Sequence, residues 1–460
     1  MTEKKSGQVD LLHGPILKSL IIFMAPIVVS YAFQQLYNAV DTAIVGNILG
    51  ENSLAAMGSC SSVFDLFVGF ANSLGAGFAL VSARAYGSGD ETRIRRAVAG
   101  SIVIGAVTMI VMTILAAVGL RPLLKLIQTP ESIFEEAYDY ISVIGLWISV
   151  MFAYNLFASL LRSIGNSVMP LVFLVISSLL NIFLDYHFIA TFHMGVAGAA
   201  IATVVSQGVS VVLCIIYILA KTKMLVPKME DFKNLDGELM KDLAGQGYAM
   251  ALMGSIVSVG SIILQSGINS LGGTDTNIIA GHTAARKVYM ICNLPFIAMG
   301  QAMSTFISQN RGADQGERIL KGMKLAYVYD FVMAAVVTVI LLLTGRTLVH
   351  LISGSTNEVI LHNGSLYLYV VGPFYAVLGV LIQTRFALQG MGSKWIPMIS
   401  SVIEFVGKVI FVIAFIPKYG YMAVIFCEPI IWCFMTAQLL YSYHNNSYVK
   451  ETKKKMKASA

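Results

Sequence analysis

Long apolar stretches alternate with short polar segments along most of the 460-residue chain. The stretches are rich in Leu, Ile, Val, Ala, Met and Gly and show no alternation of period two, so we expect membrane-spanning helices rather than barrel strands. An apolar helix of about 20 residues crosses a bilayer. Twelve stretches are long enough: 16–46, 53–83, 97–120, 137–161, 168–190, 195–220, 243–270, 277–308, 322–344, 364–390, 395–416 and 419–442.

The composition supports an all-α integral membrane protein. It is 57% hydrophobic and only 12% charged, whereas a soluble domain carries about 25% charged residues. The segments outside the helices are too short for a catalytic domain, so we do not expect an enzyme. No Walker lysine follows the Gly-rich turn at 87–91, which gives ATP no role, and no other cofactor is expected.

Basic residues gather on one side of the predicted membrane. If the N-terminus is cytoplasmic, most of the 31 Lys and Arg residues lie in cytoplasmic segments or at cytoplasmic helix ends, as the positive-inside rule requires. We therefore expect a multi-pass protein of the plasma membrane with both termini in the cytoplasm. The net charge of +6 then reflects topology and contact with lipid headgroups, and no nucleic-acid partner is expected.

The two halves of the chain resemble each other. Equivalent residues are separated by 225 or 227 positions, which predicts two parallel six-helix repeats of the kind found in secondary transporters. The matching pairs include Gly75 and Gly300, Arg93 and Arg318, Tyr140 and Tyr367, Gly145 and Gly372, and Pro170 and Pro397. The predicted parts are an N-terminal lobe (1–220), a cytoplasmic linker (221–242), a C-terminal lobe (243–442) and a cytoplasmic tail (443–460).

Polar groups at matching depth mark a candidate site in the first half. Asp41 in the first helix, Asp185 in the fifth and Thr203 in the sixth lie roughly 8–12 Å below the outer surface at about 1.5 Å rise per residue. Asn181 precedes Asp185 by four residues, so both share one helix face. Acids at membrane depth are costly and usually functional. We expect these four groups to form one pocket, although simple hydrogen bonding between helices is an alternative.

The chemistry of this pocket suits a small cation. All four groups offer oxygen ligands, which fit a hard ion such as Na⁺, while two crowded carboxylates in a low-dielectric site also favour holding a proton. Both ions remain open. The equivalent positions of the second half are Ser266, Lys408, Val412 and Glu428, so the coupling site is expected in the first half alone.

Three further features carry predictions. Glu404 and Lys408 have the i,i+4 spacing of a helical ion pair, with a structural role and a role in coupling or gating both open. Pro26 removes a backbone donor and is expected to bend the first helix. Five residues are candidates for lining a substrate cavity, with hydrogen bonding between helices as the alternative: Gln34, Tyr37, Asn38, Tyr154 and Asn155.

The sequence resembles the multidrug and toxic compound extrusion (MATE) family over essentially its whole length. The resembling segments are PIVVSYAFQQLYNAVDTAIVG in the first helix, NIFLD in the fifth and GVAGAAIAT in the sixth. The resemblance implies a monomer with two lobes arranged as a V, and a first helix that bends at Pro26. In archaeal and DinF-like members, a cation site is formed by residues that match Asp41, Asn181, Asp185 and Thr203.

The resemblance implies a secondary active multidrug exporter. Such proteins exchange Na⁺ or H⁺ for cationic, often aromatic compounds by alternating access. An alternative within the same superfamily is a flippase for lipid-linked oligosaccharides or peptidoglycan precursors. Arg286 and Lys287 would suit the pyrophosphate of such a substrate, whereas the twelve predicted helices and the acid in the first helix favour the exporter.

Overall fold

The computed structural model describes residues 7–271 and 276–458, and within these ranges it contains helices and no β-strand. In this described part, eleven helices are long and apolar enough to cross a membrane, and one bent pair raises this number to as many as 12. The prediction of an all-α, multi-pass membrane protein is therefore confirmed.

The chain divides into two compact units. The first holds the described residues of Met1–Gly14 and Ala25–Ser255, and the second holds those of Pro15–Met24 and Ile256–Ala460. The division crosses two helices, α1 (Ile16–Leu49) and α9 (Gly237–Leu271). These are the first helices of the two predicted repeats.

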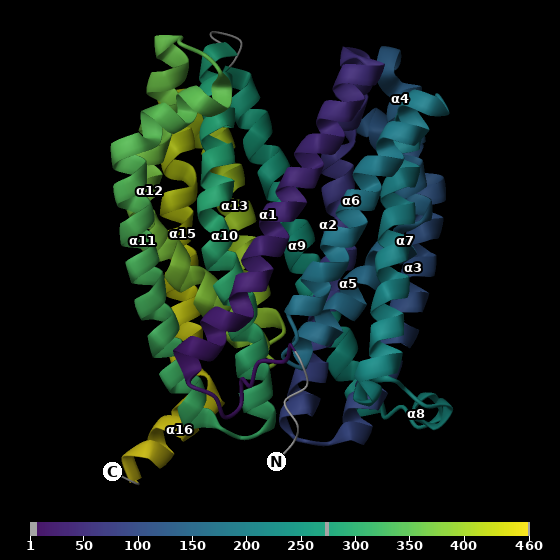
Figure 1. Cartoon of the computed structure of the whole chain (residues 1–460). Coiled ribbons are helices and arrows are strands. Elements are labelled where there is room, and N and C mark those ends of the chain that lie inside the picture. The colour runs from purple at the N-terminus through teal and green to yellow at the C-terminus, as the bar shows by residue number, and fades with distance from the viewer. Residues whose placement is uncertain (1–6, 272–275, 459–460) are drawn as a thin grey trace. The chain divides into compact units, whose positions relative to one another are not determined.

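The first unit is built from helices that lie side by side in Figure 1. They are the second part of α1, α2 (Glu51–Gly87), α3 (Glu91–Leu126), α4 (Phe134–Leu146), α5 (Ile148–Ser163), α6 (Val168–Tyr186), α7 (Gly195–Lys221) and the first part of α9, with the short elements η1 (Glu131–Ile133), η2 (His187–Thr191), η3 (Lys223–Leu225) and α8 (Met229–Lys233). The predicted fourth span is not one straight helix. It bends by 49° between α4 and α5, because the backbone of Trp147 leaves the helical conformation (φ −105°, ψ 22°).

Local chemistry explains where α2 ends and α3 begins. Gly89 adopts φ +73°, which L side chains rarely tolerate. The Asp90 side chain then caps α3 by accepting a hydrogen bond from the Arg93 N–H at 2.9 Å. The Gly-rich turn at 87–91 is thus a helix connection. Two ion pairs tie this end of the unit to the helices that follow, Arg84 to Asp242 of α9 at 2.7 Å and Arg95 to Asp231 of α8 at 3.2 Å.

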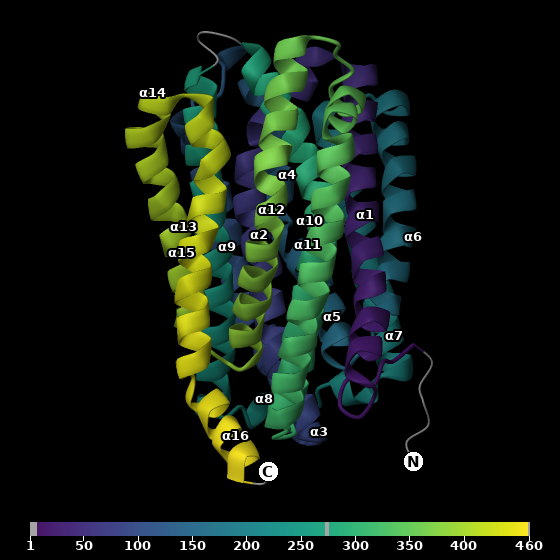
Figure 2. The ribbon, with the colours of Figure 1, turned by 90° about the vertical axis from the view of Figure 1, so that its left-hand side faces the viewer.

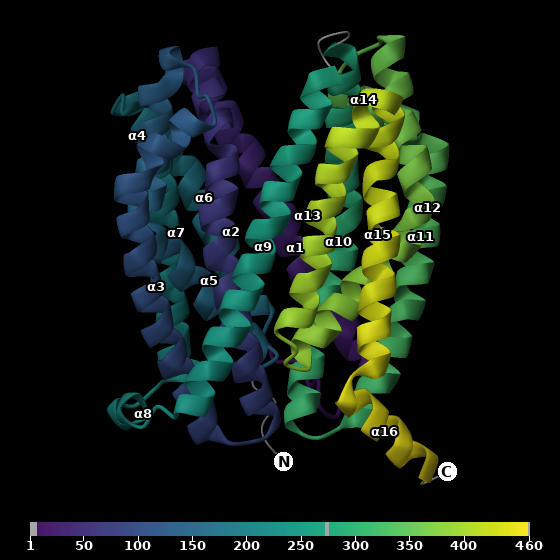
Figure 3. The same cartoon turned by 180° about the vertical axis from the view of Figure 1, so that it is seen from behind.

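The second unit contains the remaining helices. They are α10 (Thr276–Gly312), α11 (Gly316–Ser353), α12 (Glu358–Gly390), α13 (Trp395–Ile410), η4 (Phe411–Phe415), α14 (Ile416–Tyr419), α15 (Tyr421–Asn445) and α16 (Ser447–Ala458). Figure 2 shows α11 and α12 as neighbours, and α13 beside α15. After α15 the backbone is extended at Asn446, and α16 leaves at an angle (Figure 3).

The repeat is visible in backbone detail. In each unit the fifth repeat helix contains a five-residue π-helical turn near its end, at His187–Thr191 and again at Phe411–Phe415, where one further turn, α14, follows it. A glycine with φ +59° then starts the last helix of each repeat, at Gly195 and at Gly420. Positive φ at both positions favours glycine over other residues. These matching irregularities confirm the two repeats predicted from the sequence.

Candidate functional site

The predicted cation-site residues are all buried in the first unit. Asp41 lies on α1, Asn181 and Asp185 on α6, and Thr203 on α7, with Asp185 fully inaccessible. The Asp41 and Asp185 carboxyl groups are close enough for their charges to interact. Because α6 packs along α7, these residues meet in one region, as their matching depth predicts.

A small polar cavity lies in the same region. Its volume is about 10 Å³, roughly the space of a single water molecule or small ion. Tyr37, which lines it, interacts with the charges of both Asp41 and Asp185, so the carboxyl pair lies beside this cavity. The lining residues are Tyr37, Ser177, Ser178, Asn181, Thr203, Ser206 and Gln207.

Several polar atoms around the cavity lack a hydrogen-bond partner among the described residues. They are both polar atoms of the Asn181 amide, the hydroxyl oxygens of Ser178 and Ser206, and Oε1 of Gln207. Oδ1 of Asp41 and both carboxylate oxygens of Asp185 have no partner other than the contact between the two carboxyl groups themselves. A buried polar group without a partner costs about 1–3 kcal/mol, and such groups are rare in native proteins. Their concentration at one place is what a site for a bound ion, proton or water requires.

Thr203 differs from these groups because its hydroxyl already has a hydrogen-bond partner. Its hydroxyl donates to the carbonyl oxygen of Ala199 at 3.0 Å, within its own helix. The proton is therefore used, while the lone pairs of the oxygen stay available to a ligand. Tyr140 lies near the same centre, since its hydroxyl is within reach of the charges of Asp41 and Asp185.

The donor set fits a hard monovalent cation. Asp41, Asp185, Asn181 and Thr203 would hold it through oxygen atoms, the ligand type that such ions prefer. Over residues 7–271 and 276–458, no group of three His, Cys, Asp or Glu residues is arranged to hold a metal ion. Transition-metal binding therefore has no support in the described part, whereas two carboxylates with neutral oxygens suit Na⁺ or a shared proton.

A comparison with known protein families shows which family this protein belongs to. The profile of the MatE family matches residues 26–187 and 249–416, one segment in each half of the chain. The chain belongs to the MatE family. The resemblance inferred from the sequence is therefore confirmed, and the chain is a membrane transporter rather than an enzyme.

Relatives in the MatE family are similar over most of their length. The probable multidrug resistance protein YpnP of Bacillus subtilis is 26% identical, over 86% of this chain and 87% of its own. The probable multidrug resistance protein NorM of Thermotoga maritima is 25% identical, over 85% and 83%. A crystal structure of a MATE protein in the bent conformation has 24% identity and a TM-score of 0.88, covering 98% of this chain and 99% of that one, which shows a shared fold.

The five residues predicted to line a substrate cavity lie in different surroundings. Tyr37 borders the small polar cavity, Gln34 is half-buried and Asn38 is exposed. On α5, Tyr154 is buried and its hydroxyl donates to the Pro170 carbonyl at 3.4 Å. The half-buried Asn155 uses its amide nitrogen on the Met151 carbonyl at 2.9 Å. The structure thus brings Tyr37 to the acidic pair and leaves Tyr154 in the core.

Pro26 lies inside α1, which continues as one helix through it. The hydroxyl of Ser30 donates to the Pro26 carbonyl at 2.7 Å. The division between the two compact units falls between Met24 and Ala25, one residue before the proline. A missing backbone donor at that point makes α1 easier to bend where it passes from one unit to the other.

Four lining residues escaped the sequence prediction although a simple rule finds them. Ser177 and Ser178 precede Asn181 by four and three residues, and Ser206 and Gln207 follow Thr203 by three and four. Positions three or four apart share a helix face. Extending each predicted ligand along its own face would therefore have added them.

The Glu404–Lys408 pair predicted for the second unit is present. Lys408 Nζ lies 2.8 Å from Glu404 Oε1 and 3.8 Å from Glu428 Oε1. Glu404 Oε2 lies 3.9 Å from Arg385, and Glu428 Oε2 pairs with Arg286. The predicted pair is thus the centre of a larger charge network.

Proposed function

We propose that this protein is a secondary active exporter that exchanges Na⁺ or H⁺ for organic compounds, chiefly cationic or aromatic ones. The observation that carries the proposal is the group of buried oxygen atoms without partners around Asp41 and Asp185. Names of relatives support it, since YpnP and NorM are called probable multidrug resistance proteins. The protein would act as a monomer in the plasma membrane with both termini in the cytoplasm.

Cation binding provides the energy by changing the charge of one site. With the site empty, two carboxylates face each other in a low-dielectric region, which is costly. A bound Na⁺ or H⁺ removes this repulsion, so the loaded and empty states favour different conformations. Antiport follows if the cation-loaded state releases the organic compound and the empty state binds it.

Helix α1 is suited to carry this change. It bears Asp41 and the lining residue Tyr37 on its outer part, and Pro26 fifteen residues before the acid. Cation loading at Asp41 would shift the outer part of α1, with Pro26 as the point of bending. Gln34, Tyr37 and Asn38 would move with the same segment and change the surface offered to the substrate.

A flippase for a lipid-linked pyrophosphate is a second candidate. It is favoured by Arg286, whose side chain is 31% exposed within an otherwise buried network. Such a protein would move a lipid across the membrane and would not lower dye accumulation under an ion gradient.

Dye transport into proteoliposomes tests the proposal. The purified protein is reconstituted, and uptake of ethidium is followed while Na⁺ and pH gradients are imposed separately. One gradient should drive uptake, and an ionophore that dissipates that gradient should abolish it. Protein-free liposomes give the background. Dye movement equal to background under both gradients would overturn the proposal.

A further inference from the structure

Five charged side chains form an alternating chain inside the second unit. The order is Arg385, Glu404, Lys408, Glu428 and Arg286, contributed by α12, α13, α13, α15 and α10. Lys408 is almost completely buried, with 2% of its side chain exposed. Each end of the chain is therefore an arginine, and each carboxylate is shared by two cations.

This network of charged side chains lies in the second unit at the place that the cation site occupies in the first unit. With the registers set by Pro170 and Pro397, Lys408 corresponds to Asn181. With the registers set by Gly195 and Gly420, Glu428 corresponds to Thr203. The same position in the repeat thus holds oxygen ligands in one unit and a paired ammonium in the other.

The charges of this side-chain network do not balance. Three Lys and Arg cations face two carboxylates, and no further ion-pair partner contacts them within the described residues. A net positive charge in a low-dielectric region is costly and attracts an anion. The equivalent centre of the first unit has the opposite sign, since it holds the carboxyl groups of Asp41 and Asp185, which make no ion pair with a Lys or Arg among the described residues.

The excess charge is accessible at one end, at Arg286. Its side chain is 31% exposed, compared with 15% for Arg385 at the other end. The guanidinium is held by Glu428, by the Tyr367 hydroxyl at 3.1 Å and by the Tyr289 ring at 4.6 Å. Glu428 and Tyr367 share a single nitrogen, Nη1. A guanidinium has five N–H donors in a planar fork that matches carboxylate and phosphate oxygens, so a fixed Arg286 can offer its remaining donors to such a group.

We propose that Arg286 binds the carboxylate or phosphate group of a compound that the protein exports. This inference rests on the proposed exporter function and adds to its substrates a class that combines an apolar or aromatic body with an anionic group. The first unit then handles the coupling cation and the second unit recognises the anion. The other four charged side chains of the network keep the guanidinium oriented.

Two sources can supply the anionic group that Arg286 would bind, an exported solute and a lipid headgroup. Arg286 lies ten residues after the start of α10, which is about 15 Å along the helix. Since α10 has 37 residues and about 20 cross a bilayer, this position does not separate the two sources, and the experiment below does.

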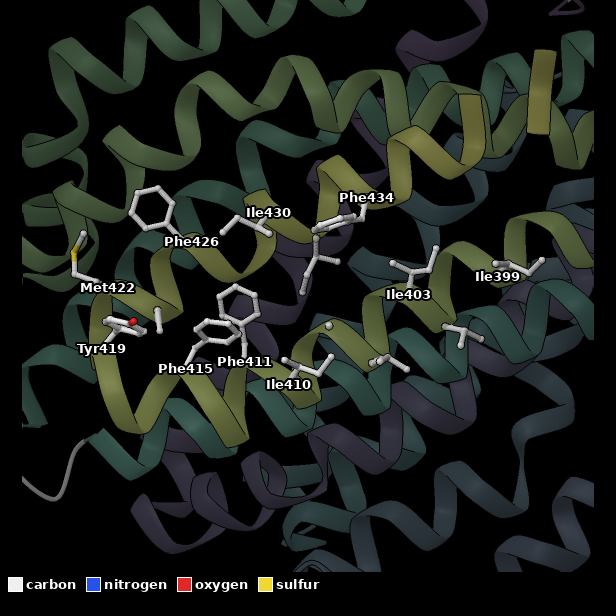
Figure 4. A pocket seen from close by; sticks show the side chains of 15 residues that line it. Ile399, Ile403, Ile410, Phe411, Phe415, Tyr419, Met422, Phe426, Ile430 and Phe434 are labelled. Carbon is white, nitrogen blue, oxygen red and sulfur yellow. The ribbon is translucent and has the colours of Figure 1, made fainter. Parts of the chain in front are cut away.

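The apolar groove of this unit lies on another face of the same helices. Ile399, Ile403 and Ile410 of α13 line it together with residues of α15 (Figure 4), and Glu404 and Lys408 are not among its lining residues. A lipid chain in that groove therefore meets no charge of the network.

Binding of matched ligand pairs tests the proposal. The full-length protein is placed in nanodiscs of phosphatidylcholine, and the affinities of flavin mononucleotide and riboflavin, which differ by one phosphate, are compared. A second pair is 1-naphthoate and 1-naphthalenemethanol. Because a charged hydrogen bond contributes roughly 10- to 100-fold in affinity, the anion of at least one pair should bind tighter by that factor.

Variants assign the preference to Arg286. In Arg286→Gln the preference for the anion should disappear, and the variant should fold because the Arg286 side chain is partly exposed and Glu428 keeps Lys408 as a partner. Arg286→Lys keeps the charge and should retain part of the preference. Lys287→Gln is the matched control, since it removes the same charge from the adjacent exposed residue, and it should bind like the wild type.

Three results would overturn the proposal: no anion preference in either pair, a preference that survives in Arg286→Gln, or an equal loss in Lys287→Gln. A fourth is loss of binding when phosphatidylglycerol is added to the nanodiscs, which would assign the site to a lipid headgroup. The assay uses no ion gradient, so its failure leaves the coupling role of Asp41 standing. Failure of gradient-driven transport would equally leave the binding result intact.

Discussion

Tyr140 and Tyr367 are equivalent residues of the two repeats, and each lies at the charged centre of its own unit. Tyr140 is within reach of the charges of Asp41 and Asp185. The Tyr367 hydroxyl donates to Glu428 at 3.3 Å and accepts from Arg286 at 3.1 Å. The repeat has therefore kept a tyrosine beside a polar centre while the charges of that centre have changed sign.

This difference explains why one unit is expected to bind a cation and the other is not. In the second unit, the ammonium of Lys408 pairs with Glu404 at 2.8 Å and lies 3.3 Å from the hydroxyl of Ser261. A covalently attached cation thus fills the position equivalent to Asn181. It cannot leave during a transport cycle, so this centre is structural or serves recognition.

Replacing Thr203 should weaken binding of the coupling cation. Thr203→Val keeps the shape of the side chain but removes the oxygen whose lone pairs face the site. A loss of about 1.4 kcal/mol corresponds to a tenfold higher cation concentration for half-maximal transport, or about one pH unit for a proton. Thr203→Ser retains the hydroxyl and should stay close to wild type. Equal values for the valine and serine variants would argue against a ligand role.

Removing Lys408 should destabilise the second unit. Lys408→Met leaves Glu404 and Glu428 buried with one cation each, and breaking a buried ion pair costs about 3–5 kcal/mol. Thermal unfolding of the purified protein measures the effect. The control is Lys321→Met, which breaks an exposed pair with Glu317 of the same i,i+4 spacing and should cost less than about 1 kcal/mol. Similar losses in both variants would contradict the buried network.

The close contact between α2, which carries Gly77, and α9 should not tolerate a methyl group at Gly77. A Cβ there would lie 2.7 Å from the Gly247 Cα and 2.8 Å from the Gln246 carbonyl oxygen, so backbone would have to move. We expect Gly77→Ala to lower stability by about 1–3 kcal/mol. Gly58→Ala, in the same helix with nothing within 4 Å, is the control. A Gly77→Ala protein as stable as the Gly58→Ala protein would show that the two helices do not pack this closely.

Pro26→Ala should slow transport without lowering stability. Alanine restores a backbone donor, which stiffens α1 at the point where it passes between the two units. The measured quantity is the initial rate of dye uptake per reconstituted protein. Pro122→Ala, in α3, is the matched control and should transport at the wild-type rate. Unchanged transport in Pro26→Ala would remove the bending role from this residue.

Much of the fold follows from the hydrophobic pattern, because membrane helices need only length and apolar character. The bend at Trp147 and the turn at His187–Thr191 do not follow, since no proline marks either of them. They depend on how neighbouring helices pack. The offset between the halves nevertheless predicts that an irregularity in one repeat recurs in the other, as Phe411–Phe415 shows.

The candidate site is predictable in part for a similar reason. Depth along each helix can be counted from the sequence, and this count places Asp41, Asp185 and Thr203 at one level, where the structure buries all three. Contacts between distant helices cannot be counted in this way. The pairing of Arg286 with Glu428, 142 positions apart, therefore becomes visible only in the folded chain.

Gradient-driven dye uptake by an Asp41→Asn protein tests the central claim most directly. Asparagine keeps the size of the side chain and removes the charge that a cation would neutralise. The control is Asp65→Asn, which removes an exposed acid from α2. We predict that Asp41→Asn shows no uptake above background under either a Na⁺ or a pH gradient, while Asp65→Asn responds like the wild type. Wild-type uptake by the Asp41→Asn protein would contradict the assignment of coupling to this site.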